Sequence, residues 1–126
     1  MQIDKPKHGQ RIIELTTKDG KILLNVAFVQ KASIQKGKVK ILYSDDNKID
    51  VIEDFEKVKS LLTKNGLFIE LNWDSYGKKS KTIYNICMIS GIYDKHGKTY
   101  LSIGTVEFEH DLVTEDYNLV KELLSS

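Results

Sequence analysis

The chain has 126 residues, of which 40% are hydrophobic and 29% charged, a balance typical of one folded domain with a true core. Nineteen basic residues against eighteen acidic residues leave a net charge of +1, which excludes a global attraction to nucleic acid or to an anionic membrane. Arg11 is the only arginine, and lysine lacks the planar fork that reads guanine edges, so sequence-specific recognition of a duplex is disfavoured.

No segment of the sequence suits secretion or a membrane span. The start, MQIDKPKHGQ, lacks an apolar core of signal-peptide length, and no run approaches the roughly 18 apolar residues of a spanning helix. The lone Cys87 lies in the apolar run IYNICMI, which excludes an intramolecular disulfide and predicts a small buried side chain. We therefore expect a cytoplasmic protein with no membrane contact. The lysine-rich, arginine-poor composition is common in low-GC bacteria and their phages or plasmids.

The first half of the chain predicts four strands and a helix. RIIELTT and KILLNVAFV flank a glycine-containing turn and predict a hairpin with strands at about 11–17 and 21–30. After a Lys-Gly turn, KVKILYS and KIDVI predict a second hairpin. Glu53 and Asp54 suit the positive end of the helix that follows. Its apolar face is expected to consist of Phe55, Val58, Leu61 and Leu62.

The second half predicts the same order of elements. The expected strands are LFIELNW, TIYNICMI, TYLSIGT and VEFEHDLV, with the polar tip DSYGKKSK between the first two. Thr114 is the expected N-cap of the last helix. The apolar face of this helix is expected to consist of Tyr117, Val120, Leu123 and Leu124.

Matches between the two halves favour an internal duplication. VIEDFEKVKSLL, at 51–62, and VTEDYNLVKELL, at 113–124, are identical at seven of twelve positions. Asn25 corresponds to Asn85, and the differences in length fall where hairpin tips are expected. The alternative is that any two amphipathic helices that begin with Glu-Asp and are rich in lysine and leucine resemble each other.

The predicted fold is therefore α+β: a mostly antiparallel sheet or partly closed barrel of about eight strands with two helices, built as two pseudo-repeats of ββββα. We expect a single domain over residues 1–126, with pseudo-repeats at about 11–65 and 67–126.

Part of the first half is similar to a known family. IELTTKDGKILLN, followed by DNKIDVIEDFEKV, resembles the small FlbD-type proteins associated with flagellar gene clusters, in which one hairpin precedes another hairpin and a short helix. The resemblance covers about 45 residues and rests on hairpin chemistry, so it carries no function to this chain.

The sequence predicts neither an enzyme nor a metal or cofactor site. The densest group of candidate ligands is EFEHD, but Glu107 and Glu109 would face one side of a strand and His110 the other. Cys87 lies in no nucleophile motif, and the glycines are scattered singly rather than gathered in a phosphate-binding loop. We expect a protein that is not an enzyme.

The candidate binding site is the hairpin NWDSYGKKSKTIY. Its members are Trp73, Tyr76, Lys78, Lys79 and Lys81. Aromatic side chains beside lysines can stack on bases while neutralising phosphates, and they can equally anchor a protein partner. The alternative is that Trp73 covers an edge of the core and the lysines keep a hairpin tip soluble.

We therefore expect a small, cytoplasmic, non-catalytic binding or regulatory protein that acts on a macromolecular partner, with a protein partner favoured. An RNA- or single-stranded-DNA-binding regulator that uses the 73–81 hairpin is the first alternative. A structural homo-oligomer that pairs exposed strand edges is the second.

Overall fold

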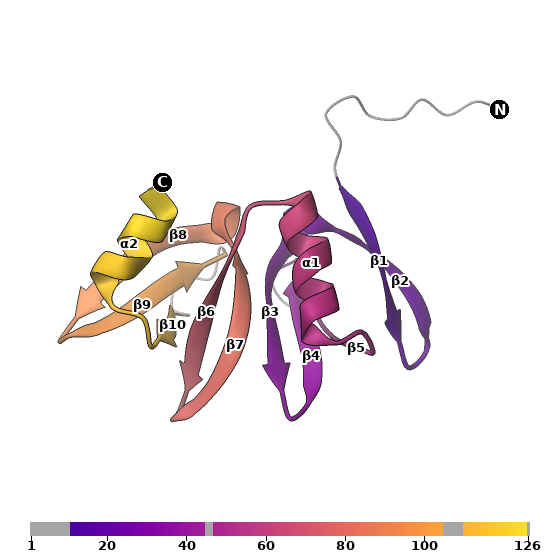
Figure 1. The fold of residues 1–126 in the computed structure, drawn as a ribbon, viewed down its shortest axis with the longest axis horizontal. Coiled ribbons are helices and arrows are strands. Elements are labelled where there is room, and N and C mark those ends of the chain that lie inside the picture. The colour runs from indigo at the N-terminus through magenta and orange to yellow at the C-terminus, as the bar shows by residue number, and fades with distance from the viewer. Residues whose placement is uncertain (1–10, 45–46, 105–109, 126) are drawn as a thin grey trace.

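The computed structural model describes residues 11–44, 47–104 and 110–125. These residues form two helices, an eight-stranded, mostly antiparallel sheet and a separate sheet of two strands (Figure 1). The predicted α+β class is confirmed, and the large sheet is open, with β5 at one edge and β8 at the other.

The two halves share one order of elements. The first half consists of β1 (Ile12–Thr17), β2 (Gly20–Asn25), the 3-10 turn η1 (Val26–Phe28), β3 (Val29–Gln35), β4 (Lys38–Tyr43), β5 (Asn47–Val51) and α1 (Phe55–Asn65). The second half consists of β6 (Phe68–Ser75), β7 (Lys78–Asn85), η2 (Ile86–Met88), β8 (Ile89–Lys95), β9 (Lys98–Ile103), β10 (His110–Val113) and α2 (Tyr117–Ser125).

Each half therefore has five strands where the sequence predicts four. The predicted strand at 21–30 is wrong, because η1 breaks it after Asn25 and a new strand begins at Val29. The Asn25 side chain accepts a hydrogen bond from the backbone N–H of Ala27, which fixes the tight turn. Asn85 accepts the equivalent bond from Cys87 and breaks the predicted strand TIYNICMI at the same place.

The order of strands in the large sheet is β5-β4-β3-β7-β6-β10-β9-β8. The halves meet where β3 pairs with β7, a contact that we call the central junction, defined by the pairs Lys31↔Tyr84, Ala32↔Ile83 and Ser33↔Thr82. Asn85 also donates to the backbone carbonyl of Val29 at 2.8 Å, across this junction. The two halves are thus joined by both backbone pairing and a buried side-chain hydrogen bond.

In both halves, the glutamate just before the helix is hydrogen-bonded to the first strand of that half. The Glu53 carboxylate accepts hydrogen bonds from the backbone N–H and the hydroxyl of Thr16. The Glu115 carboxylate accepts from the backbone N–H and the side-chain amide of Asn72. Burial opposes ionisation of Glu53, but the hydrogen bonds from Thr16, together with the backbone N–H of Glu53 and the charge of Lys57, hold the pKa of this carboxyl below its ordinary value.

The helices confirm most of the predicted apolar faces. Phe55, Val58 and Leu62 of α1 are buried in the core of the first half, as expected from their spacing. In α2, Val120 is buried, whereas Leu123 is 42% exposed, so the predicted face is too wide.

Asp54 and Asp116 cap the two helices by accepting backbone hydrogen bonds from the third residue after each of them. The prediction that Thr114 is the N-cap of α2 is wrong, because the helix begins three residues later and the Thr114 N–H bonds to Asn72 of β6.

Candidate functional site

The predicted site lies on the β6–β7 hairpin, which has the longest strands among the described residues, eight in each arm. Tyr76 and Gly77 form its two-residue turn with φ of 52° and 87°. The side chain of Tyr76 is fully exposed, and Lys78, Lys79 and Lys81 are exposed beside it.

Trp73 does not belong to this exposed group. It is half-buried against the core of the second half, next to residues of β10, and the ammonium group of Lys31 lies 3.5 Å from the centroid of its ring. The geometry matches the alternative in which Trp73 covers a core edge.

The register also places Trp73 and two of the predicted lysines on opposite faces. Trp73 pairs with Ser80, so the two side chains share one face of the hairpin. Lys79 and Lys81 alternate with Ser80 and project from the other face, while Lys78 shares the face of Trp73. The predicted residues therefore form an exposed tip of one tyrosine and three lysines, without the tryptophan.

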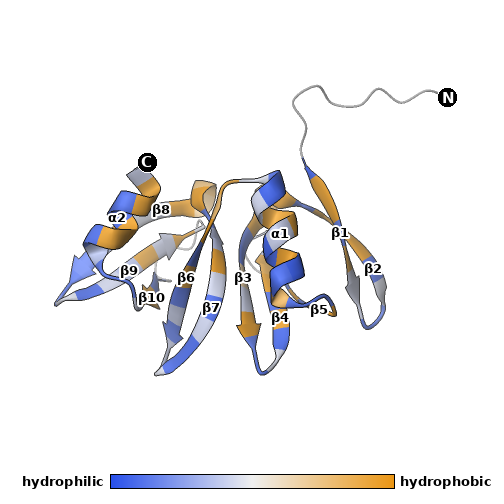
Figure 2. Cartoon of the chain, in the orientation of Figure 1, coloured by the Kyte–Doolittle hydropathy of each residue, from blue (hydrophilic) through white to orange (hydrophobic). Residues whose placement is uncertain are grey.

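This tip is one of a row. In Figure 1 the tips of the β1–β2, β3–β4 and β6–β7 hairpins point down along the lower edge of the molecule, and the β8–β9 tip continues them at the lower left. Hydrophilic residues cover the β6–β7 and β8–β9 tips in Figure 2. We call this set the basic row and define it by residues 17–21, 35–38, 74–81 and 94–98.

The basic row concentrates positive charge that the composition of the whole chain conceals. It holds nine exposed lysines: Lys18, Lys21, Lys36, Lys38, Lys78, Lys79, Lys81, Lys95 and Lys98. Three aspartates accompany them, which leaves an excess of six positive charges in a chain whose net charge is +1. A reading of net charge alone misses such a patch, because the remaining residues carry compensating acidic groups.

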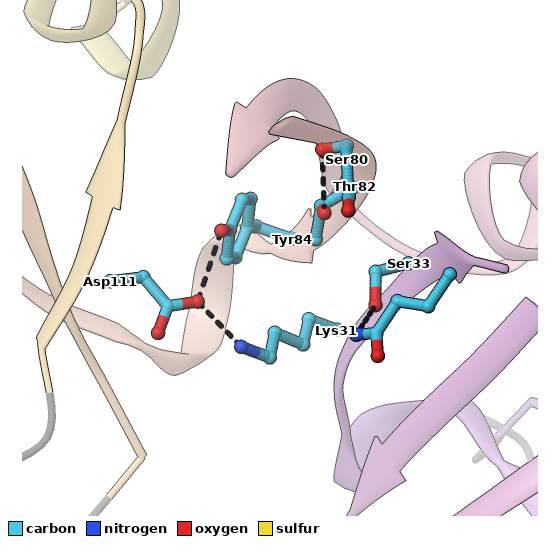
Figure 3. Close-up of polar contacts among 7 residues, drawn as sticks. Lys31, Ser33, Ser80, Thr82, Tyr84 and Asp111 are labelled. Atoms are coloured by element: carbon cyan, nitrogen blue, oxygen red, sulfur yellow. Dashed lines mark hydrogen bonds and ion pairs between the residues drawn. The ribbon is translucent and has the colours of Figure 1, made fainter. Parts of the chain in front are cut away.

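A polar cluster lies behind the tips, at the central junction. Figure 3 shows Lys31 of β3 and Tyr84 of β7 converging on Asp111 of β10. The Lys31 ammonium group lies 2.6 Å from the Asp111 carboxylate, and the Tyr84 hydroxyl donates to the same oxygen at 3.0 Å. Burial, with the nearby charge of Asp111, raises the pKa of Tyr84 above its ordinary value. The cluster is largely enclosed and serves to join the halves rather than to meet a partner.

The first half contains a pocket at the place where the second half has the side chain of Trp73. A pocket of about 850 Å³ lies between the β1–β2 hairpin, the β3–β4 tip, β5 and the start of α1. Thr17 lines this pocket. The equivalent position in the second half is Trp73, because Thr16 and Asn72, the residues just before them, donate equivalent hydrogen bonds to Glu53 and Glu115. Lys18 and Lys38 stand at its border, so the pocket opens onto the basic row.

The other sequence candidates contribute little chemistry. Glu107 and Glu109 lie outside the described residues, and the ring of His110 contacts that of Tyr93 in a tilted arrangement, with 5.1 Å between the ring centroids. Within residues 11–44, 47–104 and 110–125, no group of three or more potential ligands could hold a metal ion. The prediction that Cys87 is buried is wrong: it is exposed, because η2 interrupts the apolar run and turns the side chain outward.

Neither described helix has the length and apolarity needed to cross a membrane. No family model matches the sequence, so the likeness of its first half to FlbD-type proteins stays a resemblance. No curated protein matches it either.

The fold has a counterpart among solved structures. The chain is similar to a structure described as the LytTr DNA-binding domain of a putative methyl-accepting/DNA response regulator from Bacillus cereus, with a TM-score of 0.65 and 20% sequence identity. The match covers 94% of this chain and 100% of the other. At this identity the likeness establishes a shared fold.

Proposed function

We propose that this protein is a non-catalytic regulator that binds double-stranded DNA through the basic row. The observation that carries the proposal is the placement of nine exposed lysines on four hairpin tips along one edge of the molecule. A duplex presents regularly spaced phosphates along its length, and a row of flexible ammonium groups on a stiff sheet matches such a target.

The structural neighbour supports a nucleic-acid partner over the protein partner that the sequence favours. Its description names DNA as what it binds, and its fold extends over nearly the whole of this chain. A regulatory protein of this kind would act in the cytoplasm.

A duplex fits the exposed groups better than a single strand. Single-stranded nucleic acid is held by successive aromatic rings on which bases stack. The ring of Trp73 is covered by Lys31 and packs against the core, which leaves Tyr76 as the exposed aromatic residue on the β6–β7 tip. The basic row therefore offers nine lysines for contacts with phosphates, but no succession of aromatic rings along which bases could stack.

Lysine contacts also determine the expected kind of recognition. Ammonium groups neutralise phosphates without reading base edges in bidentate fashion, so affinity should depend strongly on salt and weakly on sequence. If each of the four tips neutralises one phosphate, the slope of log affinity against log salt concentration is about −3.6. Affinity should then fall about 150-fold between 50 and 200 mM salt.

The test is fluorescence anisotropy with a labelled duplex of random sequence, titrated at several salt concentrations. The same strand without its complement and an RNA of equal length are measured in parallel. The proposal predicts the tightest binding to the duplex and a slope near the value above. Tighter binding to the single strand or RNA, or no binding to any of the three, would overturn it.

A further inference from the structure

Besides the edges of β5 and β1, which face each other through the hydrogen bond from Ile52 to Thr16, two strand edges have no neighbouring strand among the described residues. β8 is the last strand of the eight-stranded sheet, and β2 pairs with β1 in a sheet of its own. These edges lie at opposite ends of the molecule in Figure 1. Free edges with backbone donors and acceptors favour pairing with another strand.

The two edges correspond to the two strands that pair at the central junction. β2 corresponds to β7, since each ends in an asparagine that caps the 3-10 turn after it, Asn25 or Asn85. β8 corresponds to β3, since both have one extra residue relative to the partner strand at their start, between Ile89 and Gly91 and between Val29 and Lys31. The free strands at the two ends of the molecule, β2 and β8, therefore correspond to β7 and β3, which pair with each other at the central junction.

At the central junction, apolar side chains of the second half enter the core of the first. Ile83 of β7 is fully buried there, and Phe68 of β6 packs against the same cluster. The equivalent residues of the first hairpin are Leu23 and Ile12, which are 66% and 53% exposed. Their exposure leaves an apolar surface on the free face of the β1–β2 hairpin.

At the other end of the molecule, β8 has no strand beside it that corresponds to β7. Val29 and Ala32 of β3, the strand that pairs with β7, are completely buried in the core of the first half. Their equivalents on β8, Ile89 and Ile92, are only partly buried, although both pack against the second core. The core of the second half is therefore open on the side where the core of the first half is closed.

We infer that the β2 edge of one molecule pairs antiparallel with the β8 edge of a second copy, in the register of the central junction. Leu24 would then face Gly91 of the second copy, Leu23 would face Ile92, and Ile22 would face Tyr93, which is 48% exposed in the single molecule. Continuing the register by one residue sets Lys21 opposite Asp94, so the charges at the end of the contact are complementary.

Such a contact joins unlike surfaces, head to tail. It leaves one β2 edge and one β8 edge free at the ends of every assembly, so growth continues unless a ring closes. The basic row of each copy would be followed by that of the next, an arrangement that suits binding along a polyanion. The pairing between copies does not itself require such binding.

Sedimentation velocity in about 0.5 M salt, which suppresses binding to residual nucleic acid, tests the contact. The wild-type protein should form dimers and larger species as its concentration rises from about 1 µM to about 1 mM. Leu23→Glu and Tyr93→Glu should each remain monomeric. Ile52→Glu is the matched control, because Ile52 is 68% exposed but lies beside β1 rather than on either edge, and it should assemble like the wild type.

Mixing the two edge variants identifies the pairing. Leu23→Glu keeps an intact β8 edge and Tyr93→Glu keeps an intact β2 edge, so an equimolar mixture should form dimers and nothing larger. A wild-type protein that stays monomeric throughout would overturn the inference. So would self-association of Leu23→Glu alone, which indicates a contact between like edges, or a mixture that stays monomeric.

Discussion

The β1–β2 and β6–β7 hairpins begin the two halves of the chain but lie in different surroundings. β7 pairs with β3 and buries Ile83 in the neighbouring core, whereas Leu23 at the equivalent position of β2 faces solvent. β6 pairs with β10 through Trp73, whereas β1 contacts the end of β5 and leaves a pocket beside Thr17. The comparison teaches that local sequence specifies the hairpin, the 3-10 turn and the cap in both halves, while position in the chain decides what is buried.

The largest expected effect is a difference in stability between alanine substitutions at the two equivalent positions, 83 and 23. Ile83→Ala leaves a cavity at a completely buried site and should lower the free energy of unfolding by about 2–5 kcal/mol. Leu23→Ala removes an exposed side chain and should change it by less than about 0.5 kcal/mol. Urea denaturation of the monomer measures both. Equal costs would show that the halves do not differ as described.

The closing glutamate of the first half should make stability depend on pH. The folded-state pKa of Glu53 lies below 4.5, so the stabilisation from its ionised form is complete above that pH and is lost as pH falls through the folded pKa. Glu53→Gln should cost about 1 kcal/mol at pH 7 and remove this part of the acid dependence. Glu56→Gln, at an exposed position of α1, is the control. An unchanged pH profile in Glu53→Gln would contradict the role of Thr16.

One substitution, at the β6–β7 turn, should increase stability. Tyr76 has a left-handed backbone with φ of 52°, a conformation that asparagine tolerates better than tyrosine. Tyr76→Asn should therefore raise the free energy of unfolding by roughly 1 kcal/mol. It should leave binding to the duplex unchanged, because the proposed contacts to the phosphates are made by lysines. A variant that is more stable and binds the duplex more weakly would show that Tyr76 takes part in recognition.

Much of this fold follows from local patterns in the sequence. The spacing of Phe55, Val58 and Leu62 predicts the buried face of α1, and Lys-Gly and Tyr-Gly pairs mark tight turns because glycine accepts positive φ. The sequence also contains a signal for the burial of Trp73. Ile69, Leu71 and Trp73 alternate along one strand, which places the tryptophan on the core face.

Other features depend on contacts that no local pattern contains. The apolar run around Asn25 continues with β-prone residues on both sides, so only the side-chain hydrogen bond to Ala27 distinguishes a turn from a strand. Lys31 and Asp111 are 80 residues apart and meet because β3 and β10 flank the β6–β7 hairpin. The basic row likewise exists only once the order of strands brings four hairpin tips to one edge.

The most direct measurement of the proposed function compares two double variants with equal loss of charge. Lys78→Gln with Lys79→Gln removes two lysines from the basic row, and Lys64→Gln with Lys121→Gln removes two exposed lysines from the helices. Duplex affinity should fall at least about tenfold for the first pair, with a smaller salt slope, and should change little for the second. Equal losses in the two variants would show that net charge alone governs binding and would contradict a role for the hairpin tips.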